Sequence, residues 1–236
     1  MTLQEIVDRS RRIVFFGGAG VSIESGIPDF RSVDGLYHQQ YDYPPEQILS
    51  RSFFDENPAE FYRFYRSKML CPHAKPNAAH YKLAELEQAG KCTAVVTQNI
   101  DGLHQAAGSR TVYELHGSVL RNHCMRCGRA YGVEAVAEAA GIPRCACGGI
   151  IKPDVVLYEE GLDQQTVEGA VDAIARADCL IVAGTSLSVY PAAGFIRYFQ
   201  GEHFVLINRD PTPADKLADL VLHQKVGQVL SQIQVR

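Results

Sequence analysis

The chain has 236 residues, 46% of them hydrophobic and 21% charged, and its formal net charge at pH 7 is −4. This length suits one large domain, or a large domain that carries a small one. A weakly acidic chain lacks the basic footprint of nucleic-acid-binding proteins, so we expect no nucleic-acid partner. It has no apolar run of about 18 residues and no signal-peptide core at its N-terminus, so we expect no membrane partner and a cytoplasmic location. Its seven cysteines then fit ligands or core residues better than disulfides.

Short apolar runs alternate with segments of helical periodicity along the chain. In chain order, the pattern predicts a helix behind a Thr2/Glu5 capping box, a strand over 12–16, helices over 58–69 and 78–89, a strand over 93–97, a helix over 164–176, and strands over 179–183, 203–207 and 219–222.

The predicted strands are rich in Val, Ile and Leu and show little alternation, as expected for parallel strands that are covered on both faces. Alternating strands and helices are typical of a doubly wound α/β sheet. We therefore predict a mostly parallel, Rossmann-like sheet formed by residues 1–118 and 153–236. Residues 119–152 break the alternation, and we predict that they form an inserted zinc-ribbon module, to which residues 30–75 can add a small helical part.

Four cysteines of this insert stand in two close pairs. Cys124 and Cys127 form C-x-x-C, and Cys145 and Cys147 form C-x-C. Two such pairs of thiolates are what a tetrahedral structural zinc site requires. The second pair is one residue shorter than usual, which affects the geometry more than the identity of the metal. His123 stands beside the first pair and is interpreted as a non-ligand, and four thiolates leave the zinc no open position for catalysis.

A glycine loop follows the first predicted strand, where residues 17–31 read GGAGVSIESGIPDFR. Gly18 and Gly20 supply two positions of the dinucleotide fingerprint, but Ile23 occupies the third, and no acidic residue ends a second strand about 20 residues later. An ordinary dehydrogenase is therefore disfavoured. Glycines at a helix N-terminus still bind pyrophosphate through backbone N–H groups and the helix dipole. The loop thus predicts a nucleotide held in another manner.

Polar clusters follow three other predicted strands: TQNIDG (97–102), GTS (184–186) and NRD (208–210). Each alone fits an ordinary turn. Open α/β sheets, however, place their ligands at the carboxyl ends of strands, so three clusters and a glycine loop are better explained by one shared site. His116 follows the apolar stretch VYEL, beside this site and just before the insert, which makes it a candidate base.

These motifs resemble those of the sirtuin family of NAD-dependent protein deacylases. The resemblance rests on GAGVSIESGIPDFR (18–31), TQNIDGLH (97–104), HG (116–117), the two cysteine pairs, KPDVVLYEE (152–160), GTSLSVYP (184–191) and IN (207–208). The motifs occur in the family's order and span nearly the whole chain, which is similar to the catalytic core of a bacterial-type member.

The resemblance implies an NAD site and one structural zinc ion. In sirtuins the glycine loop holds the pyrophosphate and the next segment folds over the nicotinamide ribose, where Phe30 would exclude water and Arg31 would hold phosphate. Asn99 and Asp101 match the residues of the nicotinamide pocket and ribose, and His116 matches the catalytic base. The implied NAD-binding set is Gly18, Ala19, Gly20, Ile23, Asp29, Phe30, Arg31, Gln98, Asn99, Ile100, Asp101, Gly184, Thr185, Ser186 and Asn208.

The resemblance also implies the reaction. The acyl-lysine amide oxygen attacks the ribose carbon that bears nicotinamide, and His116 removes a proton from a ribose hydroxyl so that the resulting alkylimidate can collapse. The products are nicotinamide, free lysine and O-acyl-ADP-ribose. The acyl-lysine protein or peptide lies as an added strand. Its implied contacts are Val155, Val156 and Leu157 on one side and Ser188, Val189 and Tyr190 on the other.

The acyl group is expected to be acetyl. Sirtuins that prefer acidic acyl chains carry a Tyr-x-x-Arg pair, whereas Tyr62 is followed three residues later by Tyr65, and Arg66 comes fourth. A desuccinylase-type preference through Arg66, which can share the helix face, is the alternative. Tyr158 opens a Tyr-Glu-Glu run where many members have Phe-Gly-Glu, and it is expected to reshape the mouth of the acyl-lysine tunnel.

Two other classes of function stay open. An NAD-dependent protein ADP-ribosyltransferase would share the NAD site but would not need His116 as a base. A zinc-stabilised NAD sensor without turnover would need no base at all, so the set Asn99, Asp101 and His116 argues against it.

Overall fold

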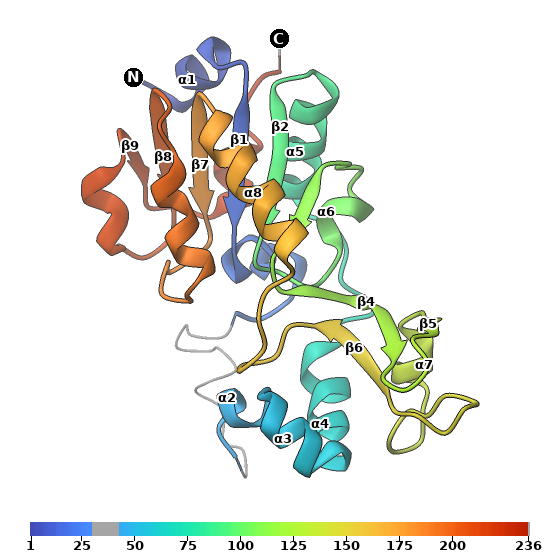
Figure 1. Ribbon diagram of the computed structural model, residues 1–236. Helices are drawn as coiled ribbons and strands as arrows, with labels where there is room; N and C mark the ends of the chain where they lie inside the picture. The colour runs from blue at the N-terminus through green and yellow to red at the C-terminus, as the bar shows by residue number, and fades with distance from the viewer. Residues whose placement is uncertain (30–42, 236) are drawn as a thin grey trace.

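The structure is a computed structural model that describes residues 1–29 and 43–235 (Figure 1). In chain order its elements are α1 (Leu3–Arg9), β1 (Ile13–Gly17), the 3₁₀ turns η1 (Ala19–Val21) and η2 (Ile23–Ser25), α2 (Pro45–Ile48), α3 (Arg51–Glu56), α4 (Pro58–Phe64), the π-helical turn η4 (Tyr65–Met69), α5 (Ala78–Gln88), β2 (Cys92–Thr97), α6 (Leu103–Ala106), β3 (Val112–Glu114), β4 (Gly117–Cys124), β5 (Ala130–Tyr131), α7 (Glu134–Ala137), β6 (Ile151–Val155), α8 (Gln164–Arg176), β7 (Cys179–Ala183), η5 (Ala192–Tyr198), β8 (His203–Ile207), η6 (Pro213–Leu217), β9 (Leu220–Leu222) and α9 (Val226–Leu230).

The larger sheet has six strands in the order β3-β2-β1-β7-β8-β9, and every neighbouring pair is parallel. The predicted doubly wound α/β fold is therefore confirmed. The strand order reverses between β1 and β7, and a reversal of this kind opens a crevice at the carboxyl ends of the two strands. The loops after β1 and β7 consequently meet there, which places the glycine loop beside residues 184–186.

Each face of this sheet is buried under helices, as Figure 1 shows for α5 on one side and α8 on the other. Successive residues of β1 alternate between the two cores: Phe15 packs with α5 residues such as Leu83, and Phe16 packs with α8 residues such as Ile174. Both phenylalanines are fully buried. Burial on both faces explains why the strands read as continuous apolar runs.

The predicted helix ends agree with the structure except after α4. At α1, Thr2 and Glu5 form the expected reciprocal capping box. The helix predicted over 58–69 instead ends at Phe64 and continues as the π-helical turn η4, in which the Leu70 N–H donates to the Tyr65 carbonyl oxygen. A wide turn absorbs one extra residue and often lies at a functional site.

The smaller module contains an antiparallel sheet in the order β5-β4-β6. Helices α2, α3 and α4 pack with this sheet in one apolar core, so residues near 43–70 and 117–157 are joined although they are distant in sequence. Gly117, at the start of β4, has a φ of 76°, and a side chain there would collide with the Asp154 carbonyl oxygen. Figure 1 shows this module beyond the carboxyl ends of the parallel strands.

No helix among the described residues combines the length and the apolar character that a membrane span requires.

Candidate active site

A cavity of about 990 Å³ lies between the carboxyl ends of the parallel strands and the smaller module. Most of the residues singled out from the sequence line it: Ala19, Gly20, Ile23, Asp29, Gln98, Asn99, Ile100, Asp101, His116, Val155, Val156, Leu157, Gly184, Thr185, Ser186, Val189, Tyr190 and Asn208. Among the other described candidates, Gly18, Ser188, Tyr62 and Tyr65 do not line it. Phe30 and Arg31 lie outside the described residues.

The glycine loop is packed tightly against the loop that follows β7. A Cβ at Gly18 would lie 2.8 Å from the Thr185 Cβ, and one at Gly20 would lie 2.7 Å from the Gly184 Cα. The Gly18 and Gly20 N–H groups donate to backbone carbonyls of residues 183 and 184. The expectation of free amides at an α-helix N-terminus is therefore wrong for Gly18 and Gly20. The loop contains the two short 3₁₀ turns η1 and η2 instead of an α-helix, and its glycines allow the close approach of two backbones.

Asn99 and Asp101 meet at a buried serine that the sequence analysis missed. The Ser22 hydroxyl donates to Asp101 Oδ2 at 2.7 Å, and Asn99 Nδ2 donates to Ser22 Oγ at 3.1 Å. Asp101 Oδ1 also accepts from the Leu103 N–H at 2.9 Å. Ser22 is only 1% exposed. A signal for it was present in the sequence, because Ser22 stands in the glycine loop next to the fingerprint position Ile23.

Thr185 and Asn208 hold each other in place across β7 and β8. The Asn208 Oδ1 accepts from the Thr185 N–H at 2.9 Å, and its Nδ2 donates to the Thr185 carbonyl oxygen at 3.0 Å. Gln98 Nε2 donates to the Thr185 hydroxyl at 3.1 Å. These bonds join the polar clusters after β2, β7 and β8 into one edge of the cavity, as the parallel topology predicts.

His116 lies between β3 and β4, where the chain passes from one module to the other. Its Nδ1 lies 3.0 Å from the Gln98 carbonyl oxygen. Because a carbonyl only accepts, Nδ1 carries the proton and Nε2 is left as an acceptor in the neutral ring. Burial lowers the pKa of His116, although the bond to Gln98 partly opposes this effect. The ring is therefore neutral and able to accept a proton near neutral pH.

Residues from two backbone segments, 155–158 and 189–190, line the cavity. In the first segment, the Val156 N–H donates to the His116 carbonyl oxygen at 2.9 Å. Just before the second, Ser186 and Ser188 share a hydroxyl hydrogen bond of 2.6 Å. Tyr158 and Tyr190 are exposed at 39% and 65%, and both line the cavity. Tyr158 is thus both exposed and part of the cavity wall, and its expected effect on the tunnel mouth stays a prediction.

Tyr62 and Tyr65 are not in the position expected for acyl recognition. Both are fully buried in the core of the smaller module, and the Tyr62 hydroxyl donates to the Ile151 carbonyl oxygen at 2.6 Å. Arg66 points into that module too and donates to the Val136 carbonyl oxygen at 2.8 Å. This helix face is buried in the apolar core of the smaller module, and so its side chains do not reach the cavity. Instead Lys68, three residues after Tyr65, lines the cavity.

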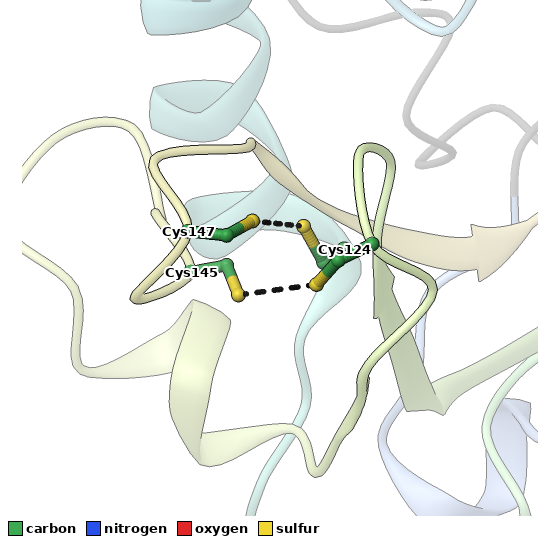
Figure 2. A group of neighbouring side chains, drawn as sticks. Cys124, Cys145 and Cys147 are labelled. Atoms are coloured by element: carbon green, nitrogen blue, oxygen red, sulfur yellow. Dashed lines mark hydrogen bonds between the residues drawn. The ribbon is translucent and has the colours of Figure 1, made fainter.

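The four cysteines predicted to bind zinc come together in the smaller module (Figure 2). All four sulfur atoms lie within 4.8 Å of one another. The sulfur atoms of Cys124 and Cys147 are 3.4 Å apart, and those of Cys127 and Cys145 are 3.6 Å apart. A tetrahedral zinc ion with Zn–S bonds of about 2.3 Å would separate its ligands by about 3.8 Å. The four thiols thus fit one structural zinc ion.

The short second cysteine pair is accommodated by its backbone. The Cys145 N–H donates to the Gly149 carbonyl oxygen, and the Gly148 N–H returns to the Cys145 carbonyl oxygen, both at 2.8 Å. The Tyr131 hydroxyl lies 3.0 Å from the Cys145 sulfur and donates to it. His123 Nδ1 contacts the Asp154 carboxylate instead and stands outside the cysteine group.

Two buried histidines behind the cavity were not singled out from the sequence. His80 on α5 and His104 on α6 have ring centroids 4.7 Å apart and are 0% and 1% exposed. His80 Nδ1 accepts from the Asn77 N–H, but neither ring nitrogen of His104 has a partner among the described residues. Burial lowers the pKa of His104 to about 3 and also lowers that of His80, against the neighbouring Asp101 charge.

Comparison with known proteins agrees with this geometry. The family model described as "Sir2 family" matches residues 18–191. An NAD-dependent protein deacetylase of Clostridium perfringens is 57% identical over 235 residues, which are 98% of this chain and 96% of the relative. An enzyme of the same name from Cutibacterium acnes is 56% identical over 230 residues, or 97% of this chain and 94% of the relative.

Solved structures show the same likeness. A Sir2 structure with a p53 peptide and NAD⁺ is 40% identical, has a TM-score of 0.85, and matches 98% of this chain and 96% of that chain. Another, with a deacetylated p53 peptide and 3′-O-acetyl-ADP-ribose, is 40% identical with a TM-score of 0.88 and the same shares of both chains. The chain therefore belongs to the Sir2 family, and the resemblance to sirtuins found in the sequence is confirmed.

Proposed function

We propose that this protein removes acetyl groups from lysine side chains of other proteins and consumes NAD in doing so. The observation that carries the proposal is the convergence of His116, Asn99 and Asp101 on one cavity at the carboxyl edge of the parallel sheet. The name of the two relatives, NAD-dependent protein deacetylase, supports it. The products are nicotinamide, free lysine and O-acetyl-ADP-ribose.

The residues of the cavity divide into three proposed roles. NAD, once bound, supplies an electrophilic ribose carbon and a leaving group. Asn99 and Asp101, tied together through Ser22, orient groups at the nicotinamide end. Thr185 and Asn208 form the adenosine end, where their reciprocal hydrogen bonds keep the loop rigid. Rigid, prearranged polar groups lose little entropy when a ligand binds.

His116 is the proposed general base. Its Nδ1–H is held by the Gln98 carbonyl, so Nε2 is the atom that accepts a proton from a ribose hydroxyl. Burial keeps the ring neutral near pH 7, as a base must be before it acts. A positioned base of this kind contributes roughly 10²–10⁴-fold to the rate.

The peptide substrate is proposed to lie as an added strand between segments 155–157 and 188–190. Val155, Val156, Leu157, Val189 and Tyr190 all line the cavity, which supports this arrangement. Main-chain pairing with an extended peptide gives affinity with little demand on sequence. Ser188 would contribute through its backbone and its bond to Ser186.

Product analysis tests the proposal directly. The purified protein is incubated with NAD and an acetyl-lysine peptide, and both peptide and nucleotide products are identified by mass spectrometry. We expect deacetylated peptide and O-acetyl-ADP-ribose in equal amounts. ADP-ribose attached to the peptide or to the protein would instead establish the ADP-ribosyltransferase alternative, and tight NAD binding without any product would establish the sensor.

The proposed location is the cytoplasm. The seven cysteines all lie in the described part of the chain and form no disulfide there, which is the state that a reducing compartment maintains. Fractionation of cells that express the protein from its own promoter, followed by immunodetection in each fraction, tests this proposal.

A further inference from the structure

The Glu160 carboxylate, beside the cavity, accepts a hydrogen bond from the backbone segment on which the proposed peptide would lie. We propose that Glu160 is a positioning residue that aims the Val156 carbonyl oxygen at a substrate amide. The inference rests on the proposed function, because it concerns the substrate of that same site. It assigns to Glu160 no contact with the reacting atoms.

The Glu160 carboxylate accepts three hydrogen bonds. Its Oε2 accepts from the Leu157 N–H at 2.9 Å and from Lys152 Nζ at 3.2 Å. Its Oε1 accepts from an Arg51 guanidinium nitrogen at 3.1 Å. The Glu160 and Lys152 side chains are only 19% and 8% exposed. Burial alone would raise the pKa of Glu160, but the Leu157 N–H and the Lys152 charge hold it below its ordinary value, so the group is ionised at neutral pH.

Most backbone polar groups around Leu157 already have partners. The Val156 N–H donates to the His116 carbonyl oxygen, and the Glu160 N–H donates to the Leu157 carbonyl oxygen. The Tyr158 N–H and carbonyl oxygen pair with residues 49 and 51. The other backbone N–H and carbonyl groups of residues 156–158 all have hydrogen-bond partners. The Val156 carbonyl oxygen accepts no hydrogen bond from the described residues. Val156 also lines the cavity and is partly exposed, and in this proposal its carbonyl oxygen accepts from the substrate.

Peptide geometry connects Glu160 to that oxygen. The Val156 carbonyl and the Leu157 N–H belong to one planar trans peptide unit, and in such a unit the two groups point in opposite directions. A carboxylate that fixes the Leu157 N–H on one side therefore fixes the direction of the Val156 carbonyl on the other. Lys152 assists, because its Nζ also donates to the Val155 carbonyl oxygen at 3.1 Å and so holds the preceding peptide unit.

Two variants grade the effect. Glu160→Gln keeps an acceptor for the Leu157 N–H but loses the charge, and hydrogen bonds to charged groups are about twice as strong as neutral ones. Glu160→Ala removes the acceptor. Calorimetry should show the Kd of an acetyl-lysine peptide raised about threefold by Glu160→Gln and about tenfold by Glu160→Ala. The Kd of NAD should change less than twofold, because the hydrogen-bond partners of Glu160 among the described residues are Arg51, Lys152 and Leu157, and none belongs to the proposed NAD site.

Asp55→Asn is the matched control. Asp55 binds the same Arg51 guanidinium, at 2.8 Å, but it lies on the exposed side of α3 and has no bond to the segment 155–158. This variant should leave the peptide Kd unchanged. Zinc content and thermal unfolding, measured for every variant, identify a protein that has failed to fold. If Glu160→Ala does not fold, the peptide Kd of Glu160→Gln tests the inference.

Amide hydrogen exchange gives a readout that requires no substrate. In the ligand-free protein, the Leu157 N–H should exchange faster in Glu160→Gln than in wild type, while the Val156 and Tyr158 N–H groups should keep their rates. Unchanged peptide affinity in a folded Glu160 variant would overturn the inference, and so would equal losses of peptide and NAD affinity. If wild type itself neither binds nor deacetylates the peptide, the proposed function fails instead.

Discussion

The Nδ1 atom of His116 lies 3.0 Å from the carbonyl oxygen of Gln98, so the residue proposed as the base is oriented by the loop that follows β2. That loop continues into Asn99 and Asp101, and Gln98 Nε2 also donates to Thr185. One short segment therefore connects the base with both ends of the proposed NAD site. A change in the backbone conformation of this segment should disturb catalysis and NAD binding together.

Replacing His116 with alanine should separate these two properties. His116→Ala leaves the Gln98 backbone in place, so the Kd of NAD should change less than about threefold. Turnover of acetyl-lysine peptide should fall by roughly 10²–10⁴-fold, because the variant has no group to accept the proton. Steady-state kinetics and NAD calorimetry on the same preparation measure both quantities. Wild-type turnover in the variant would remove His116 from the mechanism.

The same histidine predicts the acid limb of the pH profile. Burial lowers the pKa of His116 below the ordinary value of 6.5, and a base acts only when neutral. The acid limb of the kcat/KM profile, which reports the free enzyme, should therefore reach half of its maximal value below pH 6.5. A half-maximal value well above pH 6.5 would show that another group, or a His116 with a raised pKa, controls the reaction.

Loss of one zinc ligand should unfold the smaller module. Structural zinc sites supply folding free energy directly, about 10–16 kcal/mol in small peptides. We expect Cys124→Ser to lose its zinc and to aggregate or melt at a lower temperature. Cys71→Ser is the control, because Cys71 is a free thiol outside the four-cysteine group and this variant should keep one zinc ion per chain. Zinc content is measured by elemental analysis. A folded Cys124→Ser protein that still held one zinc ion per chain would refute the assignment of Cys124 as a ligand.

The buried His80–His104 pair should destabilise the protein in acid. Both pKa values are lowered on folding, so below pH 6.5 the unfolded chain binds protons that the folded chain does not. The contribution to stability is complete above pH 6.5 and is lost as the pH falls from 6.5 towards 3. Each histidine should add a slope of up to about 1.4 kcal/mol per pH unit to the free energy of unfolding.

Urea unfolding at a series of pH values tests this expectation. His104→Leu should remove one of the two contributions and flatten the acid slope, whereas the exposed His73→Gln should leave the slope unchanged. An identical slope in wild type and His104→Leu would mean that carboxylates alone account for the acid sensitivity.

Lys68 should govern the response to acidic acyl groups. It lines the cavity, whereas Tyr65 and Arg66 are turned into the smaller module. Transfer of a carboxylate into a partly apolar cavity costs several kcal/mol without a compensating partner, so acetyl-lysine should still have a higher kcat/KM than succinyl-lysine. Lys68→Ala should lower succinyl turnover further and leave acetyl turnover within about twofold.

Arg66→Ala is the comparison for that experiment. Its guanidinium donates to the Val136 carbonyl oxygen, so the variant should lose thermal stability while the acetyl-to-succinyl ratio stays the same. A ratio that changed in Arg66→Ala and not in Lys68→Ala would restore the sequence-based alternative.

The sequence by itself determined the periodic and strongly patterned parts of this protein. The strands over 179–183 and 203–207 and the helix over 164–176 occur where they were predicted, because continuous apolar runs, caps and helical periodicity act locally. The cysteine spacing also determined the metal-binding group, since two close pairs can meet at one ion whatever the loop between them does. Motif order was enough to identify the family.

Only the tertiary structure decided which polar groups meet and which helix faces the cavity. Ser22 joins Asn99 and Asp101 across a sequence distance of almost eighty residues. Its place in the glycine loop marked it as a candidate, but no local pattern could reveal these two partners. Tyr62 and Tyr65 were assigned to the substrate from the resemblance to sirtuins that bind acidic acyl groups, but both residues pack in the core of the smaller module, where the Tyr62 hydroxyl donates to the Ile151 carbonyl oxygen of β6. Side-chain direction depends on the partner surface, and the partner surface exists only when distant segments have come together.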